Sequence, residues 1–364
     1  MMAAVDKAQI EDAIRGYQDP YLNTDLVDAG AVCAIDIDGG SVRVGVDLGF
    51  PARGYRDVLA KTLRDRIAAL PGIAEVQVDV DWRVVTHAVQ KGVKPLPHIR
   101  NIIAVASGKG GVGKSTTAVN LALALSAEGA SAGILDADIY GPSQPRMLGT
   151  DARPESVDGK SMEPVMAHGI QSMSIGYLIE EESPMIWRGP MVTQALEQLL
   201  RDTRWRDMDY LVIDLPPGTG DTQLTLSQKV PVSGAVIVTT PQDIALLDAR
   251  KALKMFQRVE VPVLGVIENM STHICSKCGH EEHVFGAGGG QRMAEQYGVD
   301  LLGALPLDIR IREEADGGNP SVVTAPEGTI ALAYREIARR VAGKLALQAK
   351  DYSGKFPNIV IQNT

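Results

Sequence analysis

The sequence contains few cysteines, few aromatic residues and no long apolar run. Only three cysteines occur in 364 residues, which in a reducing compartment argues against a disulfide framework. Aromatic residues make up 4% of the chain, so the core must consist mainly of Val, Ile, Leu and Ala. No apolar stretch is long enough to cross a bilayer, and we therefore expect no membrane partner.

The chain also has no excess of basic residues over acidic ones, and it does not begin with basic residues. Its formal net charge is -9, which argues against a nucleic-acid partner. The first fourteen residues include Asp6, Glu11 and Asp12 and do not have the basic start and apolar core of a secretory signal. We therefore expect a cytoplasmic protein.

The first 83 residues predict a small α+β domain. The 55–70 helix has an apolar stripe of Val58, Leu59, Leu63, Ile67 and Leu70, and Cys33 is expected to be a buried structural residue in the first strand. Periodicity and turn residues predict helices over 5–16 and 55–70 and strands over 31–37, 42–48 and 76–80.

Residues 84–99 are expected to link this domain to a larger one over 100–349, which a tail over 350–364 follows. The segment 94–97, Lys-Pro-Leu-Pro, indicates an extended, semi-stiff spacer. The larger domain alternates apolar runs with helical patterns, which is typical of an α/β fold with a doubly wound, mostly parallel sheet. Buried strands are predicted over 101–106, 131–135, 209–214, 235–240 and 262–268.

A glycine-rich loop follows the first of these strands and opens a helix, as a phosphate-binding loop does. Its backbone N–H groups and the helix N-terminus favour phosphate oxygens. Lys114 can reach the outer phosphates of a nucleotide, and the Ser115 hydroxyl can ligate Mg²⁺. The loop residues expected to bind the nucleotide are Gly108, Lys109, Gly110, Gly111, Val112, Gly113, Lys114, Ser115 and Thr116.

Carboxylates end two of the predicted strands. Asp214 closes the apolar run 210–213, which is the Walker B pattern of a carboxylate held near Mg²⁺. Asp136 and Asp138 follow the run 132–135, where a carboxylate can lie near Mg²⁺ or orient the attacking water. We assign Asp136 to the Mg²⁺ side. The loop 215–221 is rich in Gly and Pro and suits a switch.

Cys275 and Cys278 form a Cys-x-x-Cys pair in a polar loop. A redox dithiol is one interpretation, although the helix start that such dithiols use is missing. His280 and His283 could complete a zinc site within one chain, but the spacing between them is short. Alternatively, two copies could supply four thiolates to an iron–sulfur cluster on a dimer axis.

The glycine-rich loop resembles the deviant Walker A loop of the MinD/ParA/nitrogenase-iron-protein ATPases because Lys109 adds a second lysine. Together with further motifs in order, the chain resembles the Mrp/ApbC iron–sulfur cluster carrier ATPases over nearly its whole length. Those motifs are the segments 136–143, Arg188-Gly189-Pro190-Met191, 214–221 and Cys275-x-x-Cys278. The first domain resembles the short N-terminal domain of iron–sulfur assembly factors.

This resemblance implies a homodimer that binds ATP and Mg²⁺, hydrolyses ATP slowly and passes a [4Fe–4S] cluster to apo iron–sulfur proteins. It assigns catalytic roles to Lys109, which crosses the dimer interface, to Lys114, and to Asp138 as the water-orienting residue. It also implies that Asn269 reads the adenine, with Pro306 and Asp308 beside the base.

The alternative is a MinD/ParA-like switch with a structural zinc at the two cysteines. MinD-type proteins end in a membrane-binding helix, whereas the amphipathic segment 330–347 is expected to be a packed surface helix followed by the tail.

Overall fold

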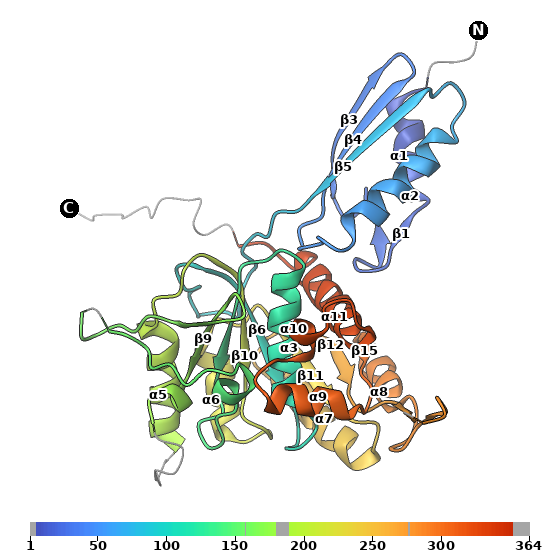
Figure 1. Cartoon of the computed structure of the whole chain (residues 1–364). Helices are drawn as coiled ribbons and strands as arrows, with labels where there is room; N and C mark the ends of the chain where they lie inside the picture. Colours follow the sequence, from blue (N-terminus) through green and yellow to red (C-terminus); the bar gives the residue numbers. More distant parts are fainter. Residues whose placement is uncertain (1–4, 157, 180–188, 276, 352–364) are drawn as a thin grey trace, which may run out of the picture.

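The structure, a computed structural model, describes residues 5–156, 158–179, 189–275 and 277–351. It contains a small N-terminal domain and a larger α/β domain (Figure 1). Within these ranges, no helix is long and apolar enough to cross a membrane.

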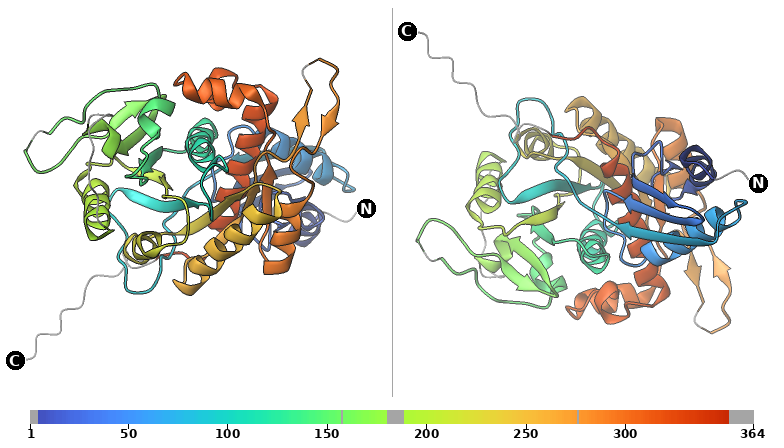
Figure 2. Two further views of the ribbon diagram at one scale, coloured as in Figure 1. Left: turned by 90° about the horizontal axis from the view of Figure 1, so that it is seen from below. Right: turned by 90° about the horizontal axis from the view of Figure 1, so that it is seen from above.

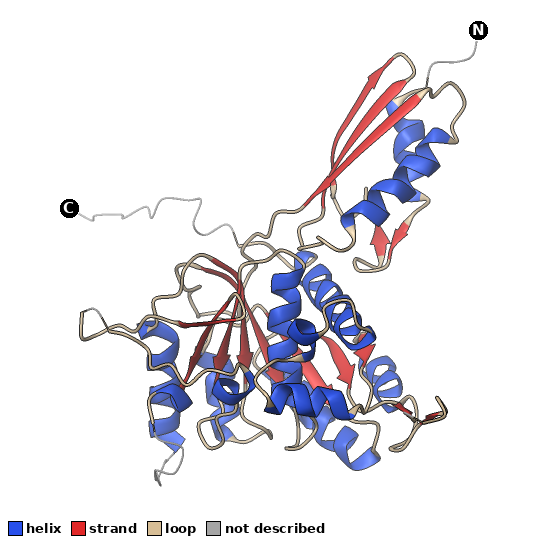
Figure 3. Ribbon diagram, in the orientation of Figure 1, coloured by secondary structure: helices blue, strands red, loops and turns tan. Residues whose placement is uncertain are grey.

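The N-terminal domain packs two helices on one face of a three-stranded sheet (Figure 3). Strands β3 and β4 are antiparallel, whereas β4 and β5 are parallel. Asp6 begins the first helix with a capping box that it forms with Gln9. The elements are α1 (Lys7–Arg15), β1 (Gln18–Asp19), β2 (Thr24–Asp25), β3 (Val32–Asp38), β4 (Ser41–Asp47), α2 (Arg56–Ala68) and β5 (Glu75–Asp81).

Two side chains of this domain differ from the prediction. Helix α2 buries Leu59, Leu63 and Ile67, but Val58 is 61% exposed, because its position on the helix faces away from the sheet. Cys33 is exposed rather than buried. The pairing of β3 with β4 shifts register between Val32 and Ala34, so that the alternation of side chains, from which burial was predicted, is interrupted at Cys33.

The larger domain has an eight-stranded sheet in the order β15-β12-β11-β6-β10-β7-β9-β8. All neighbouring strands are parallel except β8 and β9, which confirms the predicted doubly wound fold. The strands are β6 (Ile99–Ala106), β7 (Ala132–Asp136), β8 (Val165–Ala167), β9 (Ile170–Ser174), β10 (Met208–Asp214), β11 (Gly234–Thr239), β12 (Val263–Glu268) and β15 (Leu301–Ala304).

Helices cover both faces of this sheet. Along β6, Ile103 and Val105 belong to the core beneath α3, α10 and α11, whereas Ile102 and Ala104 belong to the core beneath α5, α6 and α7. The helices are α3 (Lys114–Ala127), α4 (Gln144–Met147), the 3₁₀ turn η1 (Ile175–Tyr177), α5 (Gly189–Asp202), α6 (Asp221–Lys229), α7 (Asp243–Arg258), α8 (Gly289–Tyr297), α9 (Ile309–Asp316), α10 (Ser321–Thr324) and α11 (Thr329–Ala346). The segment 330–347 is thus a packed helix, as expected.

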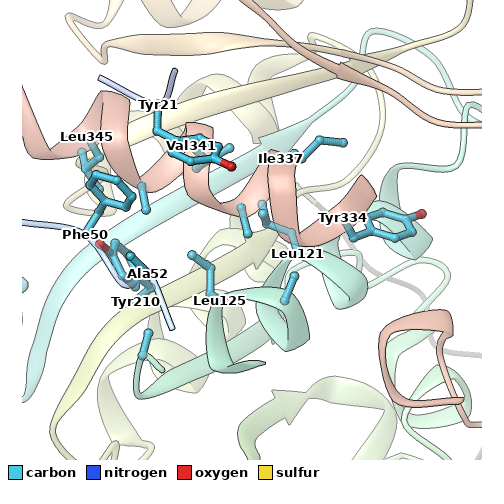
Figure 4. Packing of buried hydrophobic residues seen from close by; sticks show 14 of the residues in the cluster. Tyr21, Phe50, Ala52, Leu121, Leu125, Tyr210, Tyr334, Ile337, Val341 and Leu345 are labelled. Atoms are coloured by element: carbon cyan, nitrogen blue, oxygen red, sulfur yellow. The ribbon is translucent and has the colours of Figure 1, made fainter. Parts of the chain in front are cut away.

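The N-terminal domain docks on α3 and α11 through apolar and charged contacts. Tyr21, Phe50 and Ala52 belong to the same buried cluster as side chains of both helices (Figure 4). Glu128, directly after α3, is fully buried and accepts hydrogen bonds from Arg335 (2.7 Å) and Arg339 (2.9 Å) of α11. The other oxygen of its carboxylate accepts the backbone N–H of Gly54 at 2.9 Å. One buried carboxylate therefore joins the two domains.

The linker between the domains is partly buried rather than a free spacer. His87 is bonded to Asn101 at the start of β6 through its backbone N–H (3.1 Å) and through Nδ1 (3.0 Å). The buried Gln90 side chain donates to the carbonyl groups of Ser227 and Val230 at the end of α6 and accepts the N–H of Val232. Residues 84–90 of the linker are therefore packed against the larger domain.

Candidate functional site

The predicted phosphate-binding loop lies between β6 and α3, at the carboxyl edge of the sheet. A side chain at Gly108 would overlap the backbone of Asp248 on α7, and one at Gly113 would overlap the amide of Asn269. Gly113 also has a φ of +81°, which glycine adopts without strain. Close packing therefore requires glycine at 108, and at 113 the positive φ favours glycine as well.

Lys114 and Asp214 form a buried ion pair at the centre of the site. The Lys114 side chain is 6% exposed and that of Asp214 is 0% exposed. The lysine Nζ also lies 3.1 Å from the Ser115 Oγ, and Asp214 accepts a second hydrogen bond, at 2.9 Å, from Gln144. The phosphate-loop lysine and the Walker B carboxylate, 100 residues apart in sequence, are thus in direct contact.

Asp136 is fully buried next to this pair. Its carboxylate accepts four hydrogen bonds, from the backbone N–H groups of Asp138, Ser143 and Gln144 and from the Ser174 hydroxyl, at 2.9–3.1 Å. Burial, and then the negative charge of Asp214, raise the pKa of Asp136 to about 7. Asp138 is half-buried, and burial raises its pKa although the positive charge of Lys114 opposes the shift.

These groups fit a magnesium ion by their chemistry. Asp136 and Asp214 bring two buried carboxylates together, and Ser115 adds a hydroxyl, so the donors are the hard oxygens that Mg²⁺ prefers. Among the described side chains, the buried Oγ of Ser143 and Oε1 of Gln144 have no hydrogen-bond partner. Both oxygens belong to residues whose backbone N–H groups donate hydrogen bonds to the Asp136 carboxylate.

The predicted switch loop, 215–221, is hydrogen-bonded to the phosphate-binding loop. The N–H of Gly218 donates to the Ser107 carbonyl at 3.0 Å, and the Ser107 hydroxyl donates to the Lys109 carbonyl at 2.8 Å. The side chain of Lys109 itself is exposed. Hydrogen bonds therefore join the two loops through Ser107. Arg188, which was part of the family motif, lies outside the described residues.

Two of the residues predicted to surround the base use their side chains in hydrogen bonds. Asn269 follows β12, and its side-chain N–H donates to the Val112 carbonyl at 2.9 Å. Asp308 begins α9 by accepting the N–H of Arg310, whose guanidinium lowers the pKa of that carboxyl. The structure therefore places Asn269 against the phosphate-binding loop and gives Asp308 a capping role.

The two cysteines lie in a hairpin that projects from the body of the domain (Figure 2). Strands β13 (His273–Ile274) and β14 (Glu281–Glu282) form its arms. The N–H of Cys275 donates to the His280 carbonyl at 2.9 Å, and the Gly279 N–H donates back to the Cys275 carbonyl at 2.8 Å. Hydrogen bonds from the backbone N–H groups of Lys277 and Cys278 lower the pKa of Cys275, which favours its thiolate.

The hairpin does not bring the predicted zinc ligands together. His283 uses Nδ1 for a 2.9 Å contact with the Ser271 carbonyl, and His273 contacts the Leu307 carbonyl in the same way. Across the described part of the chain, no group of three or more His, Cys, Asp or Glu side chains is arranged to hold a metal ion. Within one chain, the described hairpin offers the two thiols as a pair.

Sequence reasoning missed three polar residues of the site. Gln144 and Ser174 are fully buried and contact the carboxylates at the ends of β10 and β7. Glu268 is buried at the end of β12, beside Asn269. A polar residue that ends a predicted strand is a usable signal for Glu268, whereas nothing local marks Gln144 or Ser174.

Comparisons with known proteins identify the family of both domains. The family model described as "NUBPL iron-transfer P-loop NTPase" matches residues 98–342, and a model described as "Iron-sulfur cluster assembly protein" matches residues 7–80. The chain is 49% identical to an "Iron-sulfur cluster carrier protein" of Haemophilus influenzae over 348 residues, which cover 95% of this chain and 94% of the relative. It is 53% identical to the mouse "Iron-sulfur cluster transfer protein NUBPL" over 254 residues, which cover 69% and 80%.

Solved structures show the same fold. A nucleotide-binding protein from Archaeoglobus fulgidus in complex with ADP superimposes with a TM-score of 0.56 at 37% identity, covering 64% of this chain and 90% of that one. The cell division ATPase MinD of Pyrococcus furiosus superimposes with a TM-score of 0.50 at 23% identity, covering 66% and 98%. The extent of the family match and the identity to the carrier proteins together establish that this chain belongs to the iron-transfer P-loop NTPases that carry iron–sulfur clusters.

Proposed function

We propose that the protein is a cytoplasmic homodimeric ATPase that holds a [4Fe–4S] cluster between two copies and passes it to apo iron–sulfur proteins. The observation that carries this proposal is the thiol pair at Cys275 and Cys278. It lies on a projecting hairpin, one thiol is biased toward thiolate, and the described residues offer no further ligand beside it. Two copies supply the four thiolates that such a cluster takes.

The nucleotide site supplies the second part of the proposal. Lys114 and the backbone N–H groups of 110–115 hold the phosphates, and Ser115, Asp136 and Asp214 are the oxygen ligands on the Mg²⁺ side. When bound, Mg²⁺ neutralises charge on the phosphate oxygens. Asp138 has a half-buried carboxylate near Lys114, which suits it to orient a water molecule. Asn269 contacts the adenine. Hydrolysis is slow, which gives the ATP-bound state time to act.

Cluster binding is tested by anaerobic reconstitution of Cys275→Ala and Cys278→Ala, with Cys33→Ala as the matched control. Cys33 is also exposed but lies in the other domain. We expect the control to keep the iron-to-thiolate absorption band and four iron atoms per dimer, and the other two variants to lose both. A full cluster in either of them would refute the bridging arrangement. Zinc in place of iron would favour a structural metal.

The two lysines of the loop are expected to separate nucleotide binding from dimer formation. Lys114 is buried on Asp214, whereas Lys109 is exposed where a second copy can reach it. Lys114→Ala should lose ATP binding in a calorimetric titration. Lys109→Ala should still bind ATP but should not show the ATP-dependent dimer in size-exclusion chromatography. Equal loss of ATP binding in both variants would contradict the role of Lys109 at an interface.

The role of Asp138 is tested by single-turnover hydrolysis. Asp138→Asn removes the carboxylate but keeps the size of the side chain, so we expect ATP to bind with the parent affinity and the hydrolysis rate to fall. An unchanged rate would exclude Asp138 as the water-orienting residue.

A further inference from the structure

A four-residue turn connects the nucleotide site to the thiol hairpin. Asn269, Met270, Ser271 and Thr272 lie between the end of β12 and the first arm of the hairpin. Met270 has a φ of +56°, a conformation that residues with a side chain rarely adopt. The turn is therefore held in an unfavourable conformation by its surroundings.

Glu268 and Ser271 close this turn on the hairpin side. The Ser271 hydroxyl donates to the Glu268 carboxylate at 2.7 Å, and the other carboxylate oxygen accepts the N–H of Gly290 at 2.5 Å. Both residues are buried. The Ser271 carbonyl accepts the contact from His283, which follows the second arm. Both arms of the hairpin are thus attached to Ser271.

Asn269 closes the turn on the nucleotide side. Its amide donates to the Val112 carbonyl and packs so closely on Gly113 that no side chain fits there. A ligand that reorganises the phosphate-binding loop therefore displaces Asn269, and the turn has little freedom to absorb the displacement. The bond from Asn269 joins the loop to one end of the turn, and the contact of His283 with Ser271 joins the other end to the hairpin.

We propose that Ser271, anchored by Glu268, is a positioning residue that transmits nucleotide occupancy to the orientation of the Cys275–Cys278 hairpin. This inference rests on the proposed nucleotide and cluster sites and adds the route between them. Because coupling between two sites is reciprocal, a metal cluster on the hairpin also changes nucleotide affinity through the same turn.

The test uses the full-length, metal-free chain under anaerobic conditions, with and without a non-hydrolysable ATP analogue and Mg²⁺. Alkylation rates of Cys275 and Cys278 are measured by mass spectrometry, with Cys33 as the internal reference. Size-exclusion chromatography first identifies a protein concentration at which the oligomeric state is the same in both conditions. In the parent we expect the analogue to change the rates about fivefold or more, the lower end of typical couplings.

Ser271→Ala removes the bond to Glu268. We expect the analogue to bind with the parent affinity, while the ratio of the alkylation rates with and without the analogue falls towards one. Ser271→Thr keeps the hydroxyl and should restore the ratio. Met270→Gly keeps the turn's backbone conformation but lowers its stiffness, and should weaken the coupling even if Ser271→Ala does not fold.

A parent ratio that persists in a folded Ser271→Ala variant would overturn the proposed route, and if that variant does not fold, a parent ratio in Met270→Gly would overturn it. Binding of the analogue by the parent without any change in alkylation would also overturn it, while leaving the proposed function intact. Failure of the parent to bind the analogue would overturn the proposed nucleotide site and, with it, this coupling.

Discussion

Glu128→Gln should destabilise the protein strongly, because it leaves two arginines facing a neutral group in the interior. The carboxylate is 0% exposed, and the side chains of Arg335 and Arg339 are 13% and 12% exposed. Glutamine can keep one acceptor oxygen but must point an N–H₂ group at either the guanidinium groups or the Gly54 N–H. Either orientation leaves donors facing donors.

Breaking one side of a buried ion pair costs about 3–5 kcal/mol, which lowers the thermal midpoint of a domain of roughly 150–250 residues by roughly 6–20 °C. The contact with Gly54 also joins the domains, so we expect hydrogen exchange at that amide to accelerate. Thermal unfolding and hydrogen exchange by mass spectrometry measure the two effects on the same variant.

Glu327→Gln is the matched control, because Glu327 contacts the same Arg335 at 3.5 Å but is 85% exposed. Exposed ion pairs contribute little, so this variant should unfold with the parent and keep the Gly54 amide protected. If Glu128→Gln unfolded within experimental error of Glu327→Gln, the carboxylate would not be the joint between the domains.

Three further outcomes follow from the packing. Gly108→Ala should lower the thermal midpoint and Gly110→Ala should not, because a methyl group at 108 overlaps the backbone of Asp248 whereas one at 110 meets nothing within 4 Å; similar midpoints would contradict this packing. Burial lowers the pKa of His87 below its ordinary value of 6.5, so the unfolded chain takes up more protons and stability should fall as the pH drops below that value. The slope of the midpoint with pH should therefore be smaller in His87→Gln, and an equal slope would exclude His87 as a source. Gln90→Ala leaves two carbonyl groups at the end of α6 without their donor, which should cost about 1–3 kcal/mol in urea unfolding, and an unchanged transition would argue against the buried linker.

The sequence allowed the central fold and the family to be predicted because both depend on local patterns. The apolar runs at 101–106 and 209–214 are long enough to identify β6 and β10, and the resemblance to cluster carriers is confirmed by the comparisons. The edge strands β8 and β15 have only three and four residues, too few for a period to be recognised.

Other features depend on contacts that no local pattern encodes. Burial of Cys33 was predicted from its place in a strand and was wrong, because one register shift interrupts the alternation. The four donors on Asp136 come from four different residues, and the contact of Gln144 with Asp214 spans 70 positions. The catalytic and metal-side roles of these groups stay predictions until they are tested.

The buried linker also decides where the chain can be cut. A fragment that starts at residue 99 keeps all of β6 but loses His87 and Gln90, so Asn101 and the end of α6 lose their hydrogen-bond partners. A fragment that starts directly after β5, at residue 82, retains them. Expression of the larger domain alone should therefore begin near residue 82, and limited proteolysis should favour the exposed stretch at 91–92 over the segment at 84–90.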